Sequence, residues 1–438
     1  MDKDLKTWII SVEMGLGHKR AVFPLKYLAY EKILFLGEKE TANESEIKLW
    51  NRMRKTYESL SRVKSFPIIG EFLFKIIDKA QEIPTRFQYK DLTSPTIQVK
   101  FIYNYFKKGL GKTLMEKIKS HPLPIISSYP IAALIADYYH YPVNYCIICD
   151  AEISRAWVAE NPHNSKIKYF APCGNAVRRL KSYGVPDDRI FLTGFPFPKE
   201  LLGDRDLNIL KYDVAQRLHY LDPKNRFFPL HEKELEHFLG VENLKFKNDR
   251  VLSITFCIGG AGAQSDIAEK ALKSLKTKIN DGEIKFNVVV GKRKNLYDHF
   301  INYINEIGIN PKNVYILYGI NDDDYFEKFS KLIRVTDILW TKPSELSFYA
   351  GLGLPILLAP IIGSQEYYNR KWLLEIQAGI LQEEPEFTNI WLFELLEDGR
   401  FAEAAWDGFL KARKYGTYKI EEILETGTMV RETNILKR

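Results

Sequence analysis

The chain alternates short runs of apolar residues with longer segments in which apolar positions recur at helical spacing. Continuous apolar runs of four to eight residues are typical of strands buried on both faces, as in a parallel sheet covered by helices. In the first half, such runs predict strands at 8–12, 33–36, 124–127, 143–148, 167–170 and 190–193. In the second half, they predict strands at 251–258, 286–290, 314–317, 337–340 and 355–359. The pattern therefore indicates an α/β fold with doubly wound parallel sheets.

The same opening, a strand followed by a glycine-rich turn and a helix, occurs twice, about half a chain apart. The first turn is Gly15-Leu16-Gly17-His18 and the second is Gly259-Gly260-Ala261-Gly262. A chain of 438 residues is too long for a single hydrophobic core, so we expect two domains. We predict that both are Rossmann-like and that they face a cleft.

The pattern also suggests where the domains begin and end. A long stretch at about 38–120 interrupts the strand–helix alternation and is interpreted as a helical insertion in the first domain. The segment 203–248 is charged, contains two prolines and has a short helical pattern at 232–239. The predicted parts are an N-terminal domain at 1–202, a connection at 203–248, a C-terminal domain at 249–400, and helices at 401–438 that pack back toward the N-terminal domain.

Composition narrows the class of protein. With 45% hydrophobic and 27% charged residues, the chain has an ordinary globular balance, which excludes wholesale disorder. The N-terminus lacks a signal-peptide pattern, and the longest apolar stretch, 352–362, is too short to cross a bilayer. Four cysteines are too few for a disulfide scaffold. We therefore expect a soluble, cytoplasmic protein.

The positive charge is concentrated in the insertion. Residues 51–119 hold 15 Lys and Arg against 6 Asp and Glu, interleaved with ten aromatic residues, whereas the whole chain has a net charge of +7. A basic, aromatic-rich surface fits the anionic inner face of a membrane, where the protein would be peripheral, and it also fits RNA. A solvated helical insertion with its own small core is the third interpretation.

The glycine turns lie where ligands bind in open parallel sheets, at the carboxyl ends of strands. In Gly259-Gly260-Ala261-Gly262 the absence of side chains lets backbone N–H groups approach a ligand, and the following helix offers its positive end. These features suit a diphosphate. A tight strand–helix turn without a ligand has the same sequence signature.

The first turn carries a candidate base. Gly15-Leu16-Gly17 resembles the start of a dinucleotide fingerprint, but Arg20 stands where its third glycine belongs, which leaves the NAD interpretation weak despite Glu38 near the ribose-binding spacing. An imidazole at a strand end, such as His18, is suited to general base catalysis. The second candidate for this role is Asp150. Ser128 and Tyr129 also follow a predicted strand and are expected to line the cleft.

The densest group of polar residues lies near the end of the second domain. It comprises Thr341-Lys342-Pro343-Ser344-Glu345, then Gly353-Leu354-Pro355, then Gly363-Ser364-Gln365-Glu366-Tyr367-Tyr368-Asn369. Carboxylates and amides at strand ends can accept hydrogen bonds from the hydroxyls of a sugar or ribose. Capping and turn roles explain Pro343 and Ser344 but not the later group of polar side chains.

In this order, the motifs resemble the GT-B glycosyltransferases, in particular the MurG N-acetylglucosaminyltransferases and the monogalactosyldiacylglycerol synthases. The resemblance implies a C-terminal domain that binds a UDP-sugar and an N-terminal domain that binds the acceptor, often a membrane lipid. It implies that His18 lies beside the acceptor hydroxyl and that Gly259, Gly260 and Gly262 face the diphosphate. It also implies that Gln365, Glu366 and Asn369 face the donor sugar or ribose. The other residues predicted on the donor side are Lys342, Ser344 and Glu345, and those predicted on the acceptor side are Gly15, Gly17, Ser128 and Tyr129.

One position departs from that family pattern. The ribose-binding glutamate usually stands about five residues before the glycine of Gly-Leu-Pro, where this chain has Phe348. Glu345 lies three residues earlier and is the candidate substitute.

The predicted activity is inverting transfer of a sugar from a nucleotide sugar, which is a co-substrate rather than a cofactor, to an acceptor hydroxyl. We expect no metal, because the nearest candidate for an Asp-x-Asp metal motif, Asp322-Asp323-Asp324, is typical of a solvated helix start. Cys146 and Cys149 are predicted to be core residues of a strand. We also expect no nucleic-acid partner. A UDP-sugar 2-epimerase-like isomerase and a non-catalytic sugar-nucleotide-binding protein are the alternatives.

Overall fold

The computed structural model describes residues 5–62, 91–246 and 250–438, which divide into two compact units. The first unit comprises Met1–Pro196 and Tyr415–Arg431, and the second comprises Phe197–Lys414 and Glu432–Arg438. The predicted connection 203–248 belongs to the second unit. Of the predicted C-terminal helices, α17 (Arg400–Lys411) belongs to the second unit and α18 (Gly416–Thr426) to the first.

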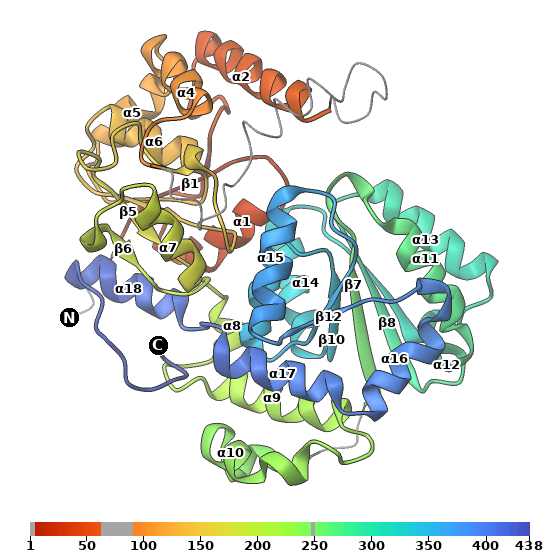
Figure 1. The fold of residues 1–438 in the computed structure, drawn as a ribbon. Coiled ribbons are helices and arrows are strands. Elements are labelled where there is room, and N and C mark those ends of the chain that lie inside the picture. Colours follow the sequence, from red (N-terminus) through yellow and green to blue (C-terminus); the bar gives the residue numbers. More distant parts are fainter. Residues whose placement is uncertain (1–4, 63–90, 247–249) are drawn as a thin grey trace. The chain divides into compact units, whose positions relative to one another are not determined.

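The first unit contains a six-stranded sheet in which all strands are parallel, in the order β2-β1-β3-β4-β5-β6. Its strands are β1 (Trp8–Ser11), β2 (Leu34–Phe35), β3 (Ile125–Ser127), β4 (Asn144–Ile147), β5 (Ile167–Phe170) and β6 (Ile190–Phe191). Its helices are α1 (Gly17–Val22), α2 (Glu44–Arg62), α4 (Ile97–Lys107), α5 (Lys112–Lys119), α6 (Pro130–Tyr138), α7 (Gly174–Ser182) and α18 (Gly416–Thr426) (Figure 1). Every residue of β1, β3 and β4 is buried, which explains their continuous apolar runs.

The second unit repeats this architecture with a different strand order, β12-β11-β10-β7-β8-β9, again fully parallel. Its strands are β7 (Leu252–Cys257), β8 (Ile284–Gly291), β9 (Val314–Tyr318), β10 (Ile338–Thr341), β11 (Ile356–Leu358) and β12 (Gly379–Leu381). Its helices are α8 (Lys199–Leu202), α9 (Asn208–Leu221), α10 (Phe228–Leu239), α11 (Ser265–Ser274), α12 (Lys276–Asn280), α13 (Lys294–Glu306), α14 (Asp322–Arg334), α15 (Ser364–Glu375), α16 (Thr388–Glu397) and α17 (Arg400–Lys411) (Figure 1). The predicted fold class, α/β with two Rossmann-like domains, is confirmed.

Each sheet has one point at which the strand order reverses. In the first unit this point lies between β1 and β3, and in the second it lies between β7 and β10. Loops diverge from the carboxyl ends of the strands there, so the crevice that forms is the usual ligand site of a doubly wound sheet. The two predicted glycine turns follow β1 and β7, the strands at these two positions.

Helix α9 occupies much of the predicted connection and was not predicted. Its Arg217 is fully buried and donates hydrogen bonds to the carbonyl oxygens of Thr336 at 2.8 Å and Leu352 at 2.7 Å. Burial lowers the pKa of Arg217 to about 10. This helix is therefore an integral part of the core of the second unit.

The basic insertion is helical as far as it is described, with α2, α4 and α5. Five of its aromatic residues lie at 63–90, outside the described residues, so the prediction of a basic aromatic surface cannot be placed on the structure there. No described helix is both long enough and apolar enough to cross a membrane.

Candidate functional site

At the carboxyl edge of the first sheet, His18 is oriented by a backbone carbonyl. His18 is the second residue of α1, and its Nδ1 lies 2.5 Å from the carbonyl oxygen of Ser128, the residue after β3. A carbonyl only accepts, so Nδ1–H must donate, and in that neutral tautomer Nε2 carries the lone pair. The structure thus brings together two predicted residues from either side of the strand reversal, in a hydrogen bond that leaves Nε2 as the proton acceptor whenever the imidazole is neutral.

Aromatic and polar side chains surround this imidazole. The ring of Tyr129 lies edge-on to the imidazole, with 5.0 Å between the two ring centroids. The centroid of the Trp157 ring lies 6.2 Å from that of the imidazole. The Sγ of Cys149 lies 3.7 Å from Nδ1 and is buried, as expected of a core residue. The Ser128 hydroxyl donates to the hydroxyl of Ser11 at 3.0 Å. Trp157 was not predicted as a site residue, because it lies in a 3₁₀ turn with no motif around it.

The other predicted residues of this unit lie on the same edge. Gly15 has a φ of +79°, a left-handed conformation that favours glycine, and an added Cβ would meet no heavy atom within 4 Å. Gly17 begins α1. Asp150 directly follows Cys149, beyond the end of β4, and is half-buried. The turn before His18 is therefore open, with both glycines beside it.

At the carboxyl edge of the second sheet, the glycine turn follows β7 and precedes α11. The N–H groups of Gly259 and Gly262 are already used within the turn, donating to the carbonyl oxygens of Ala263 and Gly259. Gly262 has a φ of +81°. An added Cβ at Gly260 would meet nothing within 4 Å, so the turn is open on that side. The turn therefore leaves room for a ligand to approach the backbone closely, but two of its N–H groups already donate within the turn.

Lys342 lies against this turn from β10, across the strand reversal. An added Cβ at Gly259 would lie 3.1 Å from the Cδ and Cε atoms of Lys342. The Lys342 ammonium is 2.5 Å from Oε1 of Glu366, and Oε2 of Glu366 accepts the N–H of Ile362 at 2.7 Å. A cation thus stands beside the turn, and Glu366 pairs with it while capping the start of α15.

The remaining predicted donor residues have varied environments. Ser344 accepts the N–H of Leu346 and begins the 3₁₀ helix Glu345–Leu352. Glu345 is half-buried in the first turn of that helix, whereas Gln365 is exposed. Asn369 is fully buried, and its Nδ2 lies 3.4 Å from the carbonyl oxygen of Pro343. Phe348, at the position of the family glutamate, is buried against Trp372.

Comparisons with known proteins agree with this architecture. The structure is similar to that of MurG from Acinetobacter baumannii, with a TM-score of 0.50 and 14% identity, covering 96% of this chain and 99% of the other. It is also similar to a putative UDP-N-acetylglucosamine 2-epimerase from Listeria monocytogenes, with a TM-score of 0.51 and 10% identity, covering 96% of both chains. The chain has the GT-B fold.

Sequence comparisons add little to this assignment. Residues 243–420 of the GT-B chain match a family described as a domain of unknown function, DUF6938. A search of curated proteins gives no match. At such low identity the structural likeness establishes the fold, and the activity has to be argued from the residues.

One further residue of the GT-B chain joins the donor-side group. Gln264, between the glycine turn and α11, has a φ of +69°, and its Nε2 donates to the carbonyl oxygen of Pro360 after β11 at 2.5 Å. It therefore ties the turn to the loop that leads to Gly363 and Glu366. The left-handed conformation of a glutamine cannot be read from sequence, which is why this residue was not predicted.

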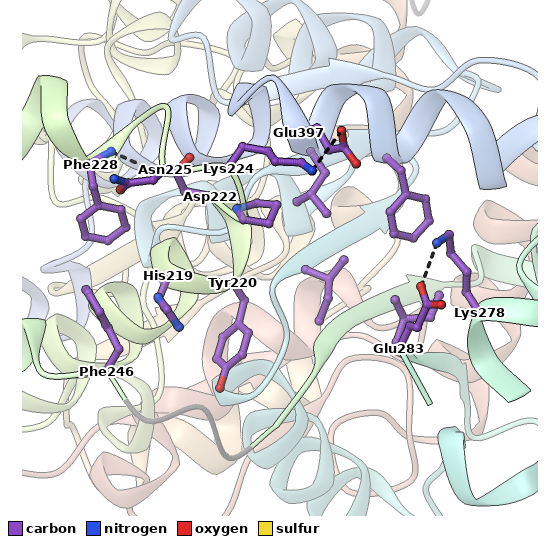
Figure 2. A pocket seen from close by; sticks show the side chains of 15 residues that line it. His219, Tyr220, Asp222, Lys224, Asn225, Phe228, Phe246, Lys278, Glu283 and Glu397 are labelled. Carbon is purple, nitrogen blue, oxygen red and sulfur yellow. Dashed lines mark hydrogen bonds and ion pairs between the residues drawn. The ribbon is translucent and has the colours of Figure 1, made fainter. Parts of the chain in front are cut away.

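Two grooves lie at the opposite, amino-terminal edge of the second sheet, away from every predicted residue. The first has a volume of about 750 Å³ (Figure 2). Its aromatic side includes His219 and Phe246, which stack at 4.5 Å, and its charged side holds the ion pairs Lys224–Glu397 and Lys278–Glu283. The second groove is considered below.

Within residues 5–62, 91–246 and 250–438, no group of three or more His, Cys, Asp or Glu side chains is arranged to hold a metal ion. Burial raises the pKa of the Cys146 thiol to about 12, which keeps it protonated.

Proposed function

We propose that the protein is a glycosyltransferase that takes a UDP-sugar and transfers the sugar, with inversion, to an acceptor hydroxyl. The observation that carries this proposal is the open glycine turn at the strand reversal of the second unit, flanked by the Lys342 ammonium. An uncrowded turn, a nearby cation and the start of α11 suit a diphosphate. The name of one GT-B neighbour, a putative UDP-N-acetylglucosamine 2-epimerase, is in keeping with a uridine nucleotide.

On the donor side, the proposed chemistry is stabilisation of the leaving group. As the bond between the anomeric carbon and the diphosphate oxygen breaks, negative charge gathers on the diphosphate. Lys342 and the dipole of α11 would stabilise that charge, and a single well-placed donor of this kind contributes about 3 kcal/mol to transition-state stabilisation. Glu366 holds the ammonium until the donor competes for it.

On the acceptor side, His18 is the proposed base. Nε2 takes the proton of the acceptor hydroxyl while its oxygen attacks the anomeric carbon from the face opposite the diphosphate, which inverts the configuration. The Ser128 carbonyl keeps the proton on Nδ1 and so fixes Nε2 as the acceptor. Asp150 remains the second candidate for this role.

An isomerase of the same fold is the alternative, because a 2-epimerase neighbour matches as well as the MurG. The two activities differ in their need for an acceptor. A 2-epimerase converts the UDP-sugar without one and retains the UDP-sugar pool. A transferase releases UDP and does so at a substantial rate only when an acceptor is added.

A lipid acceptor on an anionic membrane is the finer part of the proposal, and it rests on the charge of residues 51–119. Flotation with vesicles containing 30% anionic lipid tests it. Binding that is lost with purely zwitterionic vesicles supports a peripheral membrane enzyme, and equal recovery with both vesicle types contradicts it.

The decisive experiment for donor binding is calorimetric titration with UDP-sugars, compared with GDP-, dTDP- and CMP-sugars. We expect saturable binding of at least one UDP-sugar, with a rise in the unfolding temperature as the ligand is added. If no nucleotide sugar binds at millimolar concentration, the proposed function is wrong, whichever reaction is considered.

A further inference from the structure

The second groove at the amino edge of the sheet differs in charge from the first. It has a volume of about 770 Å³, within the range of small-molecule sites. Its cations are Arg250, Lys285, Lys312, Lys328 and Lys331, and none of the described residues that line it is acidic. In the first groove each lysine is paired with a glutamate of the same lining (Figure 2). The two grooves are therefore similar in size and lie at the same edge of the sheet, but they differ in charge.

Alternation along the strands places the two grooves on opposite faces of the sheet. Leu252 pairs with Ile284, and both line the first groove, whereas the next residues, Ser253 and Lys285, also pair and line the second. Parallel strands covered on both faces normally carry apolar residues. Lys285 is exposed although it lies in β8, so helices leave this corner of the sheet open.

The floor of the second groove is polar and internally bonded. Asn287 in β8 is almost fully buried, and its Nδ2 donates to the hydroxyls of Ser253 at 2.9 Å and Thr255 at 3.1 Å. Thr255 in turn shares a 2.7 Å hydrogen bond with Thr336. A polar network inside a sheet is costly unless it is satisfied, and here it gives a fixed, hydrophilic base to the groove.

The cations reach this groove from separate elements. Lys285 rises from the floor, Lys312 comes from the turn before β9, and Lys328 and Lys331 come from α14. Arg250 is held by two hydrogen bonds to the buried carboxylate of Asp337, at 2.6 and 2.7 Å. A ligand within the groove is thus surrounded by positive charge on several sides.

The nearby acids leave part of this charge uncompensated. Asp324 pairs with Lys328 and Glu327 with Lys331, each one helical turn away. Among the described residues, Lys285 and Lys312 have no ion pair, and both are exposed. Two lysines on neighbouring elements, β8 and the turn before β9, are therefore available to bind an anion.

We propose that this groove is a second ligand site, distinct from the proposed donor site, for a small molecule with two or more phosphoryl groups. Lys285 and Lys312 supply the charge-assisted hydrogen bonds, and the polar floor accommodates the hydrated remainder of the ligand. The volume and the spread of cations favour a ligand with several charges over a single monovalent anion. The inference goes beyond the proposed function because it does not depend on glycosyl transfer.

Lysine labelling of the full chain with pyrophosphate as the probe tests this site. We expect pyrophosphate to slow acetylation of Lys285 and Lys312 at least fivefold, measured by mass spectrometry, and to leave Lys224 and Lys278 of the first groove unchanged. Equal protection by the same concentration of sulfate, or protection of all four lysines alike, would overturn the proposal.

Variants separate this site from the proposed donor site. In the Lys342→Met variant, protection of Lys285 should persist, and its loss would mean that the probe acts from the donor site. The Lys285→Gln/Lys312→Gln variant should bind pyrophosphate at least tenfold more weakly by calorimetry, also in the Lys342→Met background. The matched control is Lys224→Gln/Lys278→Gln, and an equal loss of affinity in that control would contradict the proposal.

Discussion

The ammonium of Lys342 lies 2.5 Å from the carboxylate of Glu366, joining the end of β10 to the first turn of α15. Both residues are only partly exposed, at 23% and 12%, so the pair is better shielded from solvent than a surface ion pair. Because Glu366 also accepts the N–H of Ile362, it remains bonded when Lys342 turns to a ligand. The pair therefore keeps the Lys342 side chain beside the glycine turn.

We predict that Lys342→Met weakens binding of a UDP-sugar at least tenfold, because the diphosphate loses its side-chain cation. The free energy of unfolding should fall by only about 1 kcal/mol, since Glu366 keeps its helix-capping bond. Calorimetry and urea unfolding measure the two effects. The control is Lys371→Met, an exposed lysine of α15, and the prediction is wrong if both variants bind donor equally well.

For His18, the expected result is a loss of turnover without a loss of donor affinity. His18→Gln removes the base, and general base catalysis typically contributes a factor of about 10² to 10⁴. Initial rates with an acceptor and calorimetry with the donor measure the two quantities separately. His299→Gln, a surface histidine that contacts Glu269, should keep wild-type turnover. A His18→Gln variant with full activity would transfer the role to Asp150.

The sequence was most informative where strands are buried on both faces. The run at 167–170 coincides with β5, and the glycine turns were placed at the carboxyl ends of β1 and β7. Because parallel strands end at one edge, the polar residues that follow them can be grouped from the sequence alone. For this reason, the sequence predicts that the candidate residues lie at the carboxyl edge of each sheet.

Three features of the structure could not be predicted from the sequence, each for a physical reason. Helix α9 buries Asp213, Gln216 and Arg217 together with its apolar residues, so its hydrophobic periodicity is blurred. The edge strand β12 has only three residues. The Lys342–Glu366 pair joins residues 24 positions apart, and nothing in their local sequence indicates which partner either one has.

The glycine turn offers a test that separates ligand approach from backbone strain. Gly260 faces open space, so Gly260→Ala should leave stability within about 0.5 kcal/mol of wild type while weakening donor binding severalfold. Gly262 has a φ of +81°, so Gly262→Ala should cost about 1 kcal/mol of stability or more. Urea unfolding and calorimetry measure both variants. Unchanged donor affinity in Gly260→Ala would show that the open side of the turn does not face the donor.

The last prediction concerns Lys414, which is fully buried in the second unit. Its ammonium lies 4.6 Å from the ring centroid of Phe409. Burial, with the positive charges of Arg438 and Arg413, lowers the pKa of Lys414 from its usual 10.5 to about 7. In the unfolded chain the side chain keeps its usual pKa. Between about pH 7 and 10.5 the unfolded state therefore binds more protons than the folded state, and Lys414 makes stability rise with pH.

Replacing Lys414 by methionine should remove this pH dependence. The stability of Lys414→Met relative to wild type should be highest near pH 7 and should decline toward pH 9.5, by at most about 1.4 kcal/mol per pH unit. Urea unfolding of both proteins at several pH values measures this difference. Lys411→Met, an exposed residue of α17, should give a constant difference over the same range. Parallel stability curves for wild type and Lys414→Met would show that Lys414 stays charged in the folded protein.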